Sequence, residues 1–312
     1  MHAPEFTYDY NASALGLGGV LKHRNGSTTI IPSLASVALA PTGGEGFNEI
    51  SNYDKDGVSF SNARSSVMGY DSGHRTFTTR SDVYITNLDL FGRLKAAILQ
   101  TSVSSTREVL REGDIRQQSN PDNARFSMQA MIRGLTIDGI EIIPELDLEL
   151  CESATYEQFT NRIGGRGVDA YAKQFGVEKN DLQTVLRSQV QPIRASFVRD
   201  LQHKPTDKFG PRKGFKLPVK RFGHVHFGEM VVKPGRRRVN LLRIEFDSTL
   251  RFGERVPQGI GERVAQVIEE KVAQASALIT DSVDLESADS PSPYKGFATI
   301  MSLDGNGAPS WP

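Results

Sequence analysis

Two histidines lie two residues apart in a segment rich in Val and Phe. Period-two alternation would place the imidazoles of His224 and His226 on one face of a strand. Paired imidazoles can begin a metal site, which would need a further ligand such as Glu229 or Glu245. Because a metal requires three or four converging ligands, ordinary cross-strand packing is the main interpretation. His224 and His226 are the candidate metal ligands.

Acidic residues alternate with leucines between residues 145 and 150. The alternation predicts a strand with Glu145, Asp147 and Glu149 on one face and three leucines on the other. Carboxylates about 7 Å apart could bind calcium or act as a glycosidase pair. A solvated strand face gives the same pattern, so no catalytic residue is assigned. A carbohydrate-active hydrolase that also uses Glu141 remains an alternative.

Basic residues gather between positions 204 and 238. The candidate partner-binding residues are Lys208, Arg212, Lys213, Lys216, Lys220, Arg221, Arg236, Arg237 and Arg238. Such a set could meet an acidic polysaccharide or an acidic surface of another subunit. Phe209, Phe215 and Phe222 interleave with it, as in stacking platforms for sugars or bases. A solvated loop is the alternative interpretation.

Residues 172–186 match the spacing of a helix-turn-helix, with Gly176 at the turn. Any two helices joined by a glycine turn share this pattern, and a DNA-reading helix would prefer Arg, Gln or Asn to Glu178 and Asp181. The chain carries 37 Lys and Arg against 37 Asp and Glu, whereas nucleic-acid binders usually have a basic excess. DNA binding through this segment therefore stays a minor alternative.

The candidate site residues lie within or between short segments that have the alternation of β-strands and are separated by turn residues. Asn25-Gly26, Asp56-Gly57 and Asp138-Gly139 predict hairpins, because their residues tolerate positive φ. Spacing changes to helical after Cys151, and strands resume around a turn at Lys233-Pro234-Gly235. We expect a mainly β (α+β) protein with antiparallel, sandwich-like sheets, a helical insertion and a C-terminal amphipathic helix. The expected divisions are a β-rich domain at 1–253 with the insertion at 154–201, the helix at 254–281 and an extended tail at 282–312.

Composition narrows the class of protein. The 312 residues are 38% hydrophobic and 24% charged, as in a folded globular protein. One Cys excludes an intrachain disulfide and a cysteine zinc cluster. No stretch approaches the ~18 apolar residues of a spanning helix, and the first residues have no leader pattern. We expect a soluble chain, cytoplasmic as given, or secreted if a leader was removed.

Several motifs resemble those of a known group. Tyr8–Gly46, Phe91–Ala96 and Gly134–Gly139 are similar to bacterial β-rich proteins related to the secreted choice-of-anchor P type. His224 and its neighbours, followed by Leu241–Phe246, resemble the closing hairpin of the same group. The resemblance spans about Tyr8 to Leu250 and implies a β fold and a bacterial source. It implies no activity and no catalytic residue.

Catalytic signatures such as Gly-x-Ser-x-Gly, a phosphate loop or His-Glu-x-x-His do not occur in the sequence. We therefore expect a non-enzymatic surface or self-assembling protein that needs no cofactor. Its contacts would use sheet edges, the basic loop and the extended tail, with copies of itself or with acidic polysaccharide.

Overall fold

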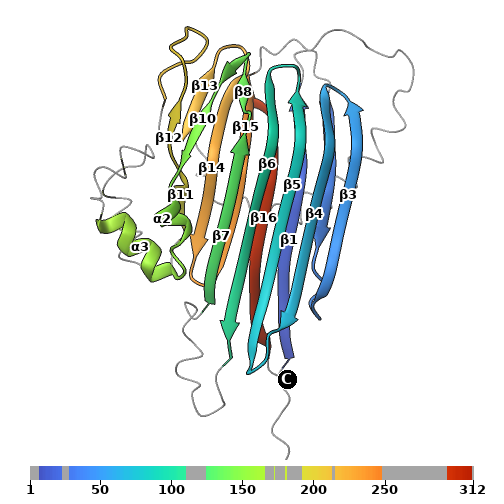
Figure 1. The fold of residues 1–312 in the computed structure, drawn as a ribbon, viewed down its shortest axis with the longest axis vertical. Coiled ribbons are helices and arrows are strands. Elements are labelled where there is room, and N and C mark those ends of the chain that lie inside the picture. Colours follow the sequence, from blue (N-terminus) through green and yellow to red (C-terminus); the bar gives the residue numbers. More distant parts are fainter. Residues whose placement is uncertain are drawn as a thin grey trace, which may run out of the picture. The chain divides into compact units, whose positions relative to one another are not determined.

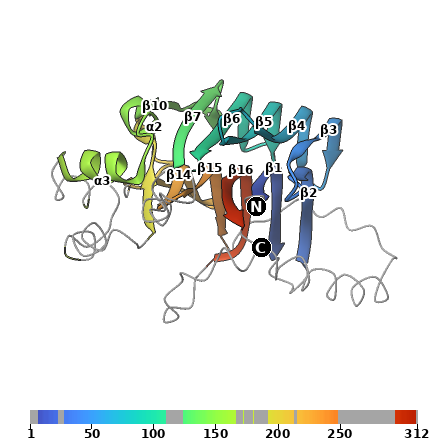
Figure 2. The ribbon, with the colours of Figure 1, turned by 90° about the horizontal axis from the view of Figure 1, so that it is seen from below.

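The computed structural model describes residues 7–22, 28–109, 124–165, 172, 180, 192–212, 215–247 and 294–310. Two large antiparallel sheets lie face to face, and Figure 2 shows them as two layers seen along the strands. The prediction of a mainly β sandwich is confirmed. The predicted helix at 254–281 and nearly all of the helix-turn-helix segment lie outside the described residues.

Sheet A contains the chain's first and last described strands. Its order is β11 (Ile193–Ser196), β14 (Gly223–Lys233), β15 (Arg236–Asp247), β16 (Tyr294–Ser310), β1 (Thr7–Lys22) and β2 (Thr28–Ala38), with β13 (Lys216–Val219) also paired to β14. The hairpin predicted around Lys233-Pro234-Gly235 joins β14 to β15, and Gly235 has a φ of 68°.

Sheet B is a meander that forms the nearer layer in Figure 1. Its strands are β3 (Gly44–Lys55), β4 (Val58–Asp71), β5 (Thr76–Leu90), β6 (Leu94–Glu108), β8 (Thr136–Ile137) and β9 (Ile140–Glu141), with β7 (Ala124–Arg133) also paired to β6. The turns at Asp56-Gly57 and Asp138-Gly139 have positive φ at both residues, as predicted. Asn25-Gly26 lies outside the described residues.

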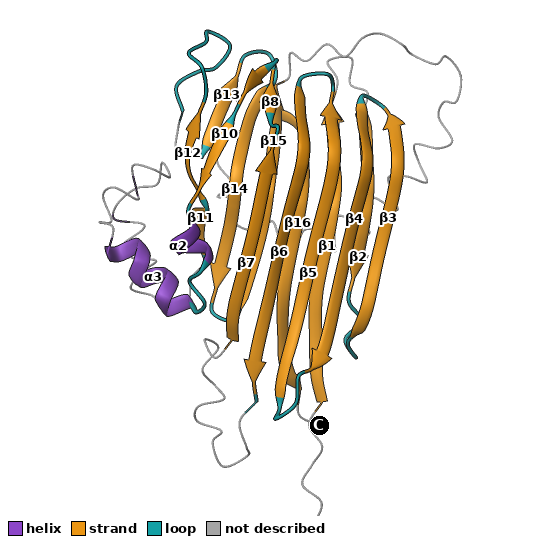
Figure 3. Cartoon of the chain, viewed as in Figure 1, coloured by secondary structure: helices purple, strands orange, loops and turns teal. Residues whose placement is uncertain are grey.

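The remaining elements stand beside the sandwich, as Figure 3 shows in purple and orange. They are β10 (Ile143–Leu146), its partner β12 (Val198–Gln202), α2 (Leu148–Cys151) and α3 (Tyr156–Gly165). Of the helical insertion predicted at 154–201, α3 is helical, whereas residues 193–196 and 198–202 are strands. Burial of Ile193 and Ala195 against β14 explains the difference. No helix among the described residues is long and apolar enough to cross a membrane.

Residues 294–310 correct the prediction of an extended tail. They form β16, which pairs with β15 on one side and with β1 on the other. Ile300 and Leu303 are fully buried, opposite Leu17 and Val239 respectively. This short apolar pattern overrides the Gly, Ser and Pro content that suggested a tail, because the sheet supplies partners for the backbone amides on both sides.

The core between the sheets is apolar with a few hydroxyl groups. Buried residues such as Ile85 and Leu99 of sheet B pack between the two layers. Ser81, which is also buried, donates from Oγ to the carbonyl of Asp304 at 3.1 Å and so links β5 to β16. Satisfying such hydroxyls avoids the cost of about 1–3 kcal/mol for an unpaired buried polar group.

Strands β1 to β6 and β14 to β16 each reverse their side-chain alternation at one residue. These residues form a line across each sheet, which we call the inversion row. In β14 the buried apolar side chains that alternate are Val225 and Phe227 before Gly228, and Met230 and Val232 after it. The row in sheet A is Gly228, Leu241, Met301, Gly16 and Ala35, and that in sheet B is Asn52, Ser61, Asn87 and Ala97. Positive φ occurs on alternate strands of both rows: Gly228, Met301, Ala35, Asn52 and Asn87.

Candidate functional site

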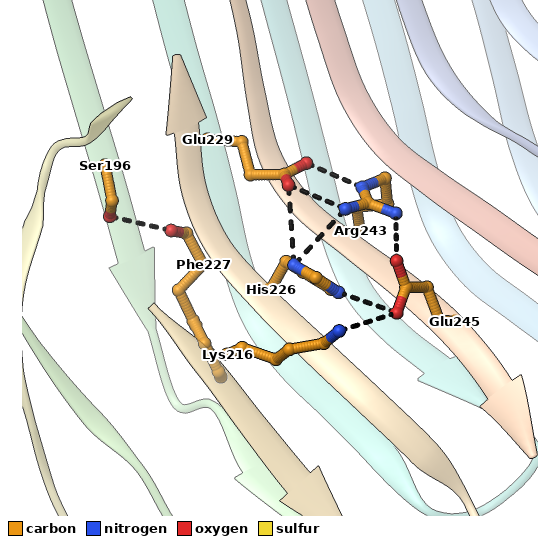
Figure 4. A network of polar contacts seen from close by, with 7 residues as sticks. All are labelled: Ser196, Lys216, His226, Phe227, Glu229, Arg243 and Glu245. Atoms are coloured by element: carbon orange, nitrogen blue, oxygen red, sulfur yellow. Dashed lines mark hydrogen bonds and ion pairs between the residues drawn. The ribbon is translucent and has the colours of Figure 1, made fainter. Parts of the chain in front are cut away.

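A cluster of charged side chains lies on β13, β14 and β15, as Figure 4 shows. It forms because the inversion row crosses β14 within it. Two residues three positions apart on a regular strand face opposite sides of the sheet. Because the alternation reverses at Gly228, where φ is 59°, His226 and Glu229 instead share one face. Arg243, the register partner of His226, lies beside both. We call His226, Glu229, Arg243, Glu245 and Lys216 the ionic cluster.

Arg243 is the centre of the ionic cluster. It donates to Glu229 through Nε and Nη2, at 2.7 and 2.8 Å, and to Glu245 through Nη1 at 2.7 Å. Such fork-shaped pairing is the strongest geometry available to a guanidinium and a carboxylate. The two glutamates are therefore held in fixed positions on adjacent strands.

His226 fills the space between the two carboxylates. Its Nδ1 lies 3.3 Å from Arg243 Nη2 and 3.4 Å from Glu229 Oε1. Its Nε2 lies 3.1 Å from Glu245 Oε2, outside the directions of a hydrogen bond. Lys216 Nζ lies 3.1 Å from the same oxygen, so β13 joins the ionic cluster.

Burial and charge act in opposite directions on these carboxyls. Burial alone would raise the pKa of Glu229, but hydrogen bonds from Arg243 and His226 outweigh it and lower the pKa to about 2. Burial would also raise the pKa of Glu245, yet His226 and Arg243 lower it below its ordinary range. Burial, followed by the charge of Lys216, lowers the pKa of His224. Both glutamates are therefore anions at neutral pH.

The structure places both candidate metal ligands on β14, with the imidazole of His226 against Glu229 and Glu245. Arg243 and Lys216 already pair with these carboxylates. The part of the chain that the structure describes contains no group of three His, Cys, Asp or Glu side chains that could hold a metal ion. The arrangement supports an internal ion network that fixes β13, β14 and β15 together.

The candidate partner-binding residues separate into two groups at opposite ends of the β14–β15 hairpin. Lys208, Arg212, Lys220 and Arg221 belong to loops near the start of β14, whereas Arg236 and Arg238 follow its end. A strand of this length separates them by about 30 Å. They do not form one continuous basic surface.

Most of these cations have partners within the chain. The contacts join Arg212 to Asp200 at 2.6 Å, Lys220 to Asp207 at 3.6 Å, Lys208 Nζ to the carbonyl of Asp138 at 2.9 Å, Arg236 to Asp304 at 2.5 Å and Arg238 to Asp304 at 3.4 Å. Lys213 lies outside the described residues. Phe209 and Phe222 are buried, so their rings are not an exposed stacking platform.

Arg237 has a different environment from its neighbours. It is fully buried, donates to the carbonyl of Ser153 and lies 4.9 Å from the ring centroid of Phe126. The carbonyl of Ser153, which accepts this hydrogen bond, lies between α2 and α3. Arg237 therefore anchors the helices to sheet A. A residue in this position is not accessible to a partner.

Arg93 is a residue that the sequence analysis did not single out. It pairs with Asp138 through Nε and Nη2, at 2.7 and 2.6 Å, and donates to the carbonyls of Lys220 and Arg221 at 2.9 and 2.5 Å. The turns of sheet B and the β13–β14 turn of sheet A are thus tied together. The only sequence signal is the position of Arg93 and Asp138 beside turn glycines.

The predicted acidic strand ends at Leu146, which corrects the alternation expected to Leu150. Asp147 instead caps α2, where its side chain accepts from Leu150 N at 3.1 Å. Glu149 pairs with Arg162 at 2.9 Å, and Glu145 lies 3.8 Å from Arg199. An aspartate before a helical turn satisfies a free amide, and this local gain ends the strand. The carboxylates do not share one strand face.

The outer face of sheet B is the face turned away from sheet A. No described element lies in front of it in Figure 1. One cross-strand row on it is Phe47, Ser66, Asp82, Ser102 and Gln129, and the next is Glu49, Arg64, Tyr84, Gln100 and Met131. Phe47, Tyr70 and Tyr84 are 70%, 49% and 36% exposed. Aromatic side chains on an open polar face are typical of a contact surface.

A long antiparallel sandwich with an internal ionic cluster and one open sheet face defines a mainly β protein. The chain belongs to the family described as Domain of unknown function (DUF8256), which matches residues 8–210. The match includes all of sheet B, whereas the ionic cluster and β16 follow it in the sequence. No curated protein and no solved structure matches the chain.

Proposed function

We propose that this protein is a non-enzymatic structural protein that associates with copies of itself through the outer face of sheet B. The observation that carries this proposal is the exposure of Phe47, Tyr70 and Tyr84 on a sheet face that no described element covers. Tyrosine is among the residue types that most often anchor protein interfaces. The resemblance to secreted choice-of-anchor P type proteins supports a place at the bacterial cell surface.

The open face is better suited to this role than the free edge of β3. Ser51 faces outward and Tyr53 faces inward, although residues two apart on a regular strand share one face. The inversion row, which crosses β3 at Asn52, causes this difference. Antiparallel pairing of two full-length β3 edges would therefore set outward residues of one copy against inward residues of the other. Pairing centred on Phe47 would place Glu45 opposite Glu49, which like charge disfavours.

The other expected contact regions give less support. β16 uses its backbone partners inside sheet A, so the segment 294–310 is not an arm for a neighbour. Most of the described basic residues already pair within the chain, which reduces the attraction for an acidic polysaccharide.

Light scattering after size-exclusion chromatography tests the proposal over a wide range of protein concentration. We expect the mass to rise above that of the 34.3 kDa chain as concentration increases. Tyr84→Ser removes one of the exposed aromatic side chains without changing the charge and should shift the mass at a given concentration toward that of a single chain. A chain that stays monomeric at every concentration would contradict self-association.

A further inference from the structure

The charges on the outer face of sheet B are arranged asymmetrically. Glu45 and Glu49 lie on β3 at one side, and Arg125 and Arg133 lie on β7 at the other. All four side chains are exposed. On β5, midway between them, Arg80 and Asp82 neutralise each other at 2.8 Å. Arg64 of β4 is also exposed on this face, opposite Glu49, so it offsets one of the two carboxylates. The face therefore keeps a smaller negative charge at the β3 side, is neutral on β5 and is basic at the β7 side.

This gradient is self-complementary under one symmetry operation. Consider a two-fold axis that runs parallel to the strands and passes over β5. It would place β3 of each copy opposite β7 of the other copy, so the β3–β7 contact would occur two times in the dimer. The strand register then places Glu49 of one copy one cross-strand row away from Arg133 of the other, and Glu45 one row away from Arg125. One row corresponds to an offset of about 7 Å along the strands. An axis perpendicular to the strands would superpose β3 on β3 and bring the unneutralised Glu45 carboxylates of the two copies together. The parallel axis brings like residues together only on β5, where Arg80 and Asp82 neutralise each other.

We infer that two copies of this chain pair face to face through sheet B about a two-fold axis parallel to β5. The inference rests on the proposed function and names its geometry. Tyr84, on the central strand, would lie near its own symmetry mate. Isologous contacts of this kind close after two copies.

The size of the face fits a stable dimer. Five strands spaced by about 4.8 Å and nine residues of common length give roughly 700 Å² for each copy. A standard specific interface removes about 800 Å² from each partner. Aromatic anchors with polar rows between them match the composition of such interfaces.

Charge reversal tests the geometry. Arg133→Glu and Glu49→Arg, each alone, would place like charges opposite one another and weaken the dimer about tenfold or more. Combining both changes in one chain restores opposite charges in both contacts and should recover most of the affinity. The matched control, Arg199→Glu, changes an exposed arginine on β12 and should leave the dimer unchanged.

Crosslinking gives an independent test. In a Cys151→Ser background, Tyr84→Cys should form a covalent dimer on mild oxidation, because the position lies near its symmetry mate. Ser36→Cys, exposed on β2 of the other sheet, should not. If the protein is a dimer but the double charge variant does not recover affinity and Tyr84→Cys does not crosslink, this geometry is overturned while self-association remains. A monomer at every concentration would overturn both.

Discussion

Arg243 and Glu229 face each other through two parallel hydrogen bonds of 2.7 and 2.8 Å, although regular strand geometry gives Glu229 the opposite face from His226. The inversion at Gly228 brings Glu229 to that face. One backbone conformation therefore lets Arg243, which also donates to Glu245, hold a second partly buried carboxylate. The stability of the hairpin should depend on this contact.

Replacing Arg243 with Met should destabilise the protein by about 3–5 kcal/mol, because Glu229 would stay buried without its main partner. Glu229→Gln should cost less, and the double variant should recover part of the loss in a double-mutant cycle. Urea unfolding measures all three. The matched control is Arg162→Met, whose exposed pair with Glu149 should contribute about 1 kcal/mol or less. Equal losses at both arginines would contradict the assigned role.

The low pKa of Glu229 predicts how stability depends on pH. The folded pKa of about 2 lies below the ordinary value of 4.5, so the stabilisation is complete above about pH 4.5 and declines as pH falls toward 2. The shift corresponds to about 3 kcal/mol. Urea unfolding at several pH values checks this. Glu229→Gln should lose less stability over the same interval, and an identical pH profile in both proteins would refute the assignment.

Gly228 should tolerate no side chain. Its φ is 59°, and an added Cβ would lie 2.8 Å from Val198 Cγ2 and 3.1 Å from the Phe197 ring. We expect Gly228→Ala to cost about 2–4 kcal/mol through strain and overlap. Gly92→Ala, at a φ of 69° with open space around it, is the control and should cost about 1 kcal/mol. Thermal unfolding separates the two variants, and similar melting temperatures would show that the contacts of Gly228 are unimportant.

The parts of the fold that local chemistry determines could be predicted from the sequence. Asp56-Gly57 and Asp138-Gly139 indicated their hairpins because few residues accept positive φ at two successive positions. The strands around Gly235 followed from their alternation. By contrast, the apolar residues of β16 are followed by Gly, Asn, Pro and Ser, and the place of the strand depends on backbone partners from β1 and β15 that are distant in sequence.

The ionic cluster could be predicted only in part, because period-two reasoning separates His226 from Glu229. A signal was present in the sequence: Phe227 and Met230 are apolar three residues apart, as are Ile85 and Leu88 in sheet B. Such a phase shift marks an inversion of faces. Its alignment across strands requires the register, which the sequence alone does not contain.

Cys151 should be unreactive in the folded protein. Burial, and then the charge of Asp147, raise the pKa of its thiol to about 12, so almost no thiolate exists at pH 8. A coloured thiol reagent should therefore react slowly with the native chain and at once in denaturant. In a Cys151→Ser background, Ser36→Cys offers an exposed thiol on β2, away from the proposed dimer face, as the control and should react promptly without denaturant. Gly228→Ala, if it destabilises the chain as expected, should speed the reaction of Cys151, because that thiol becomes accessible when the structure opens. Prompt labelling of Cys151 in the native chain would mean that α2 does not shield the thiol from solvent.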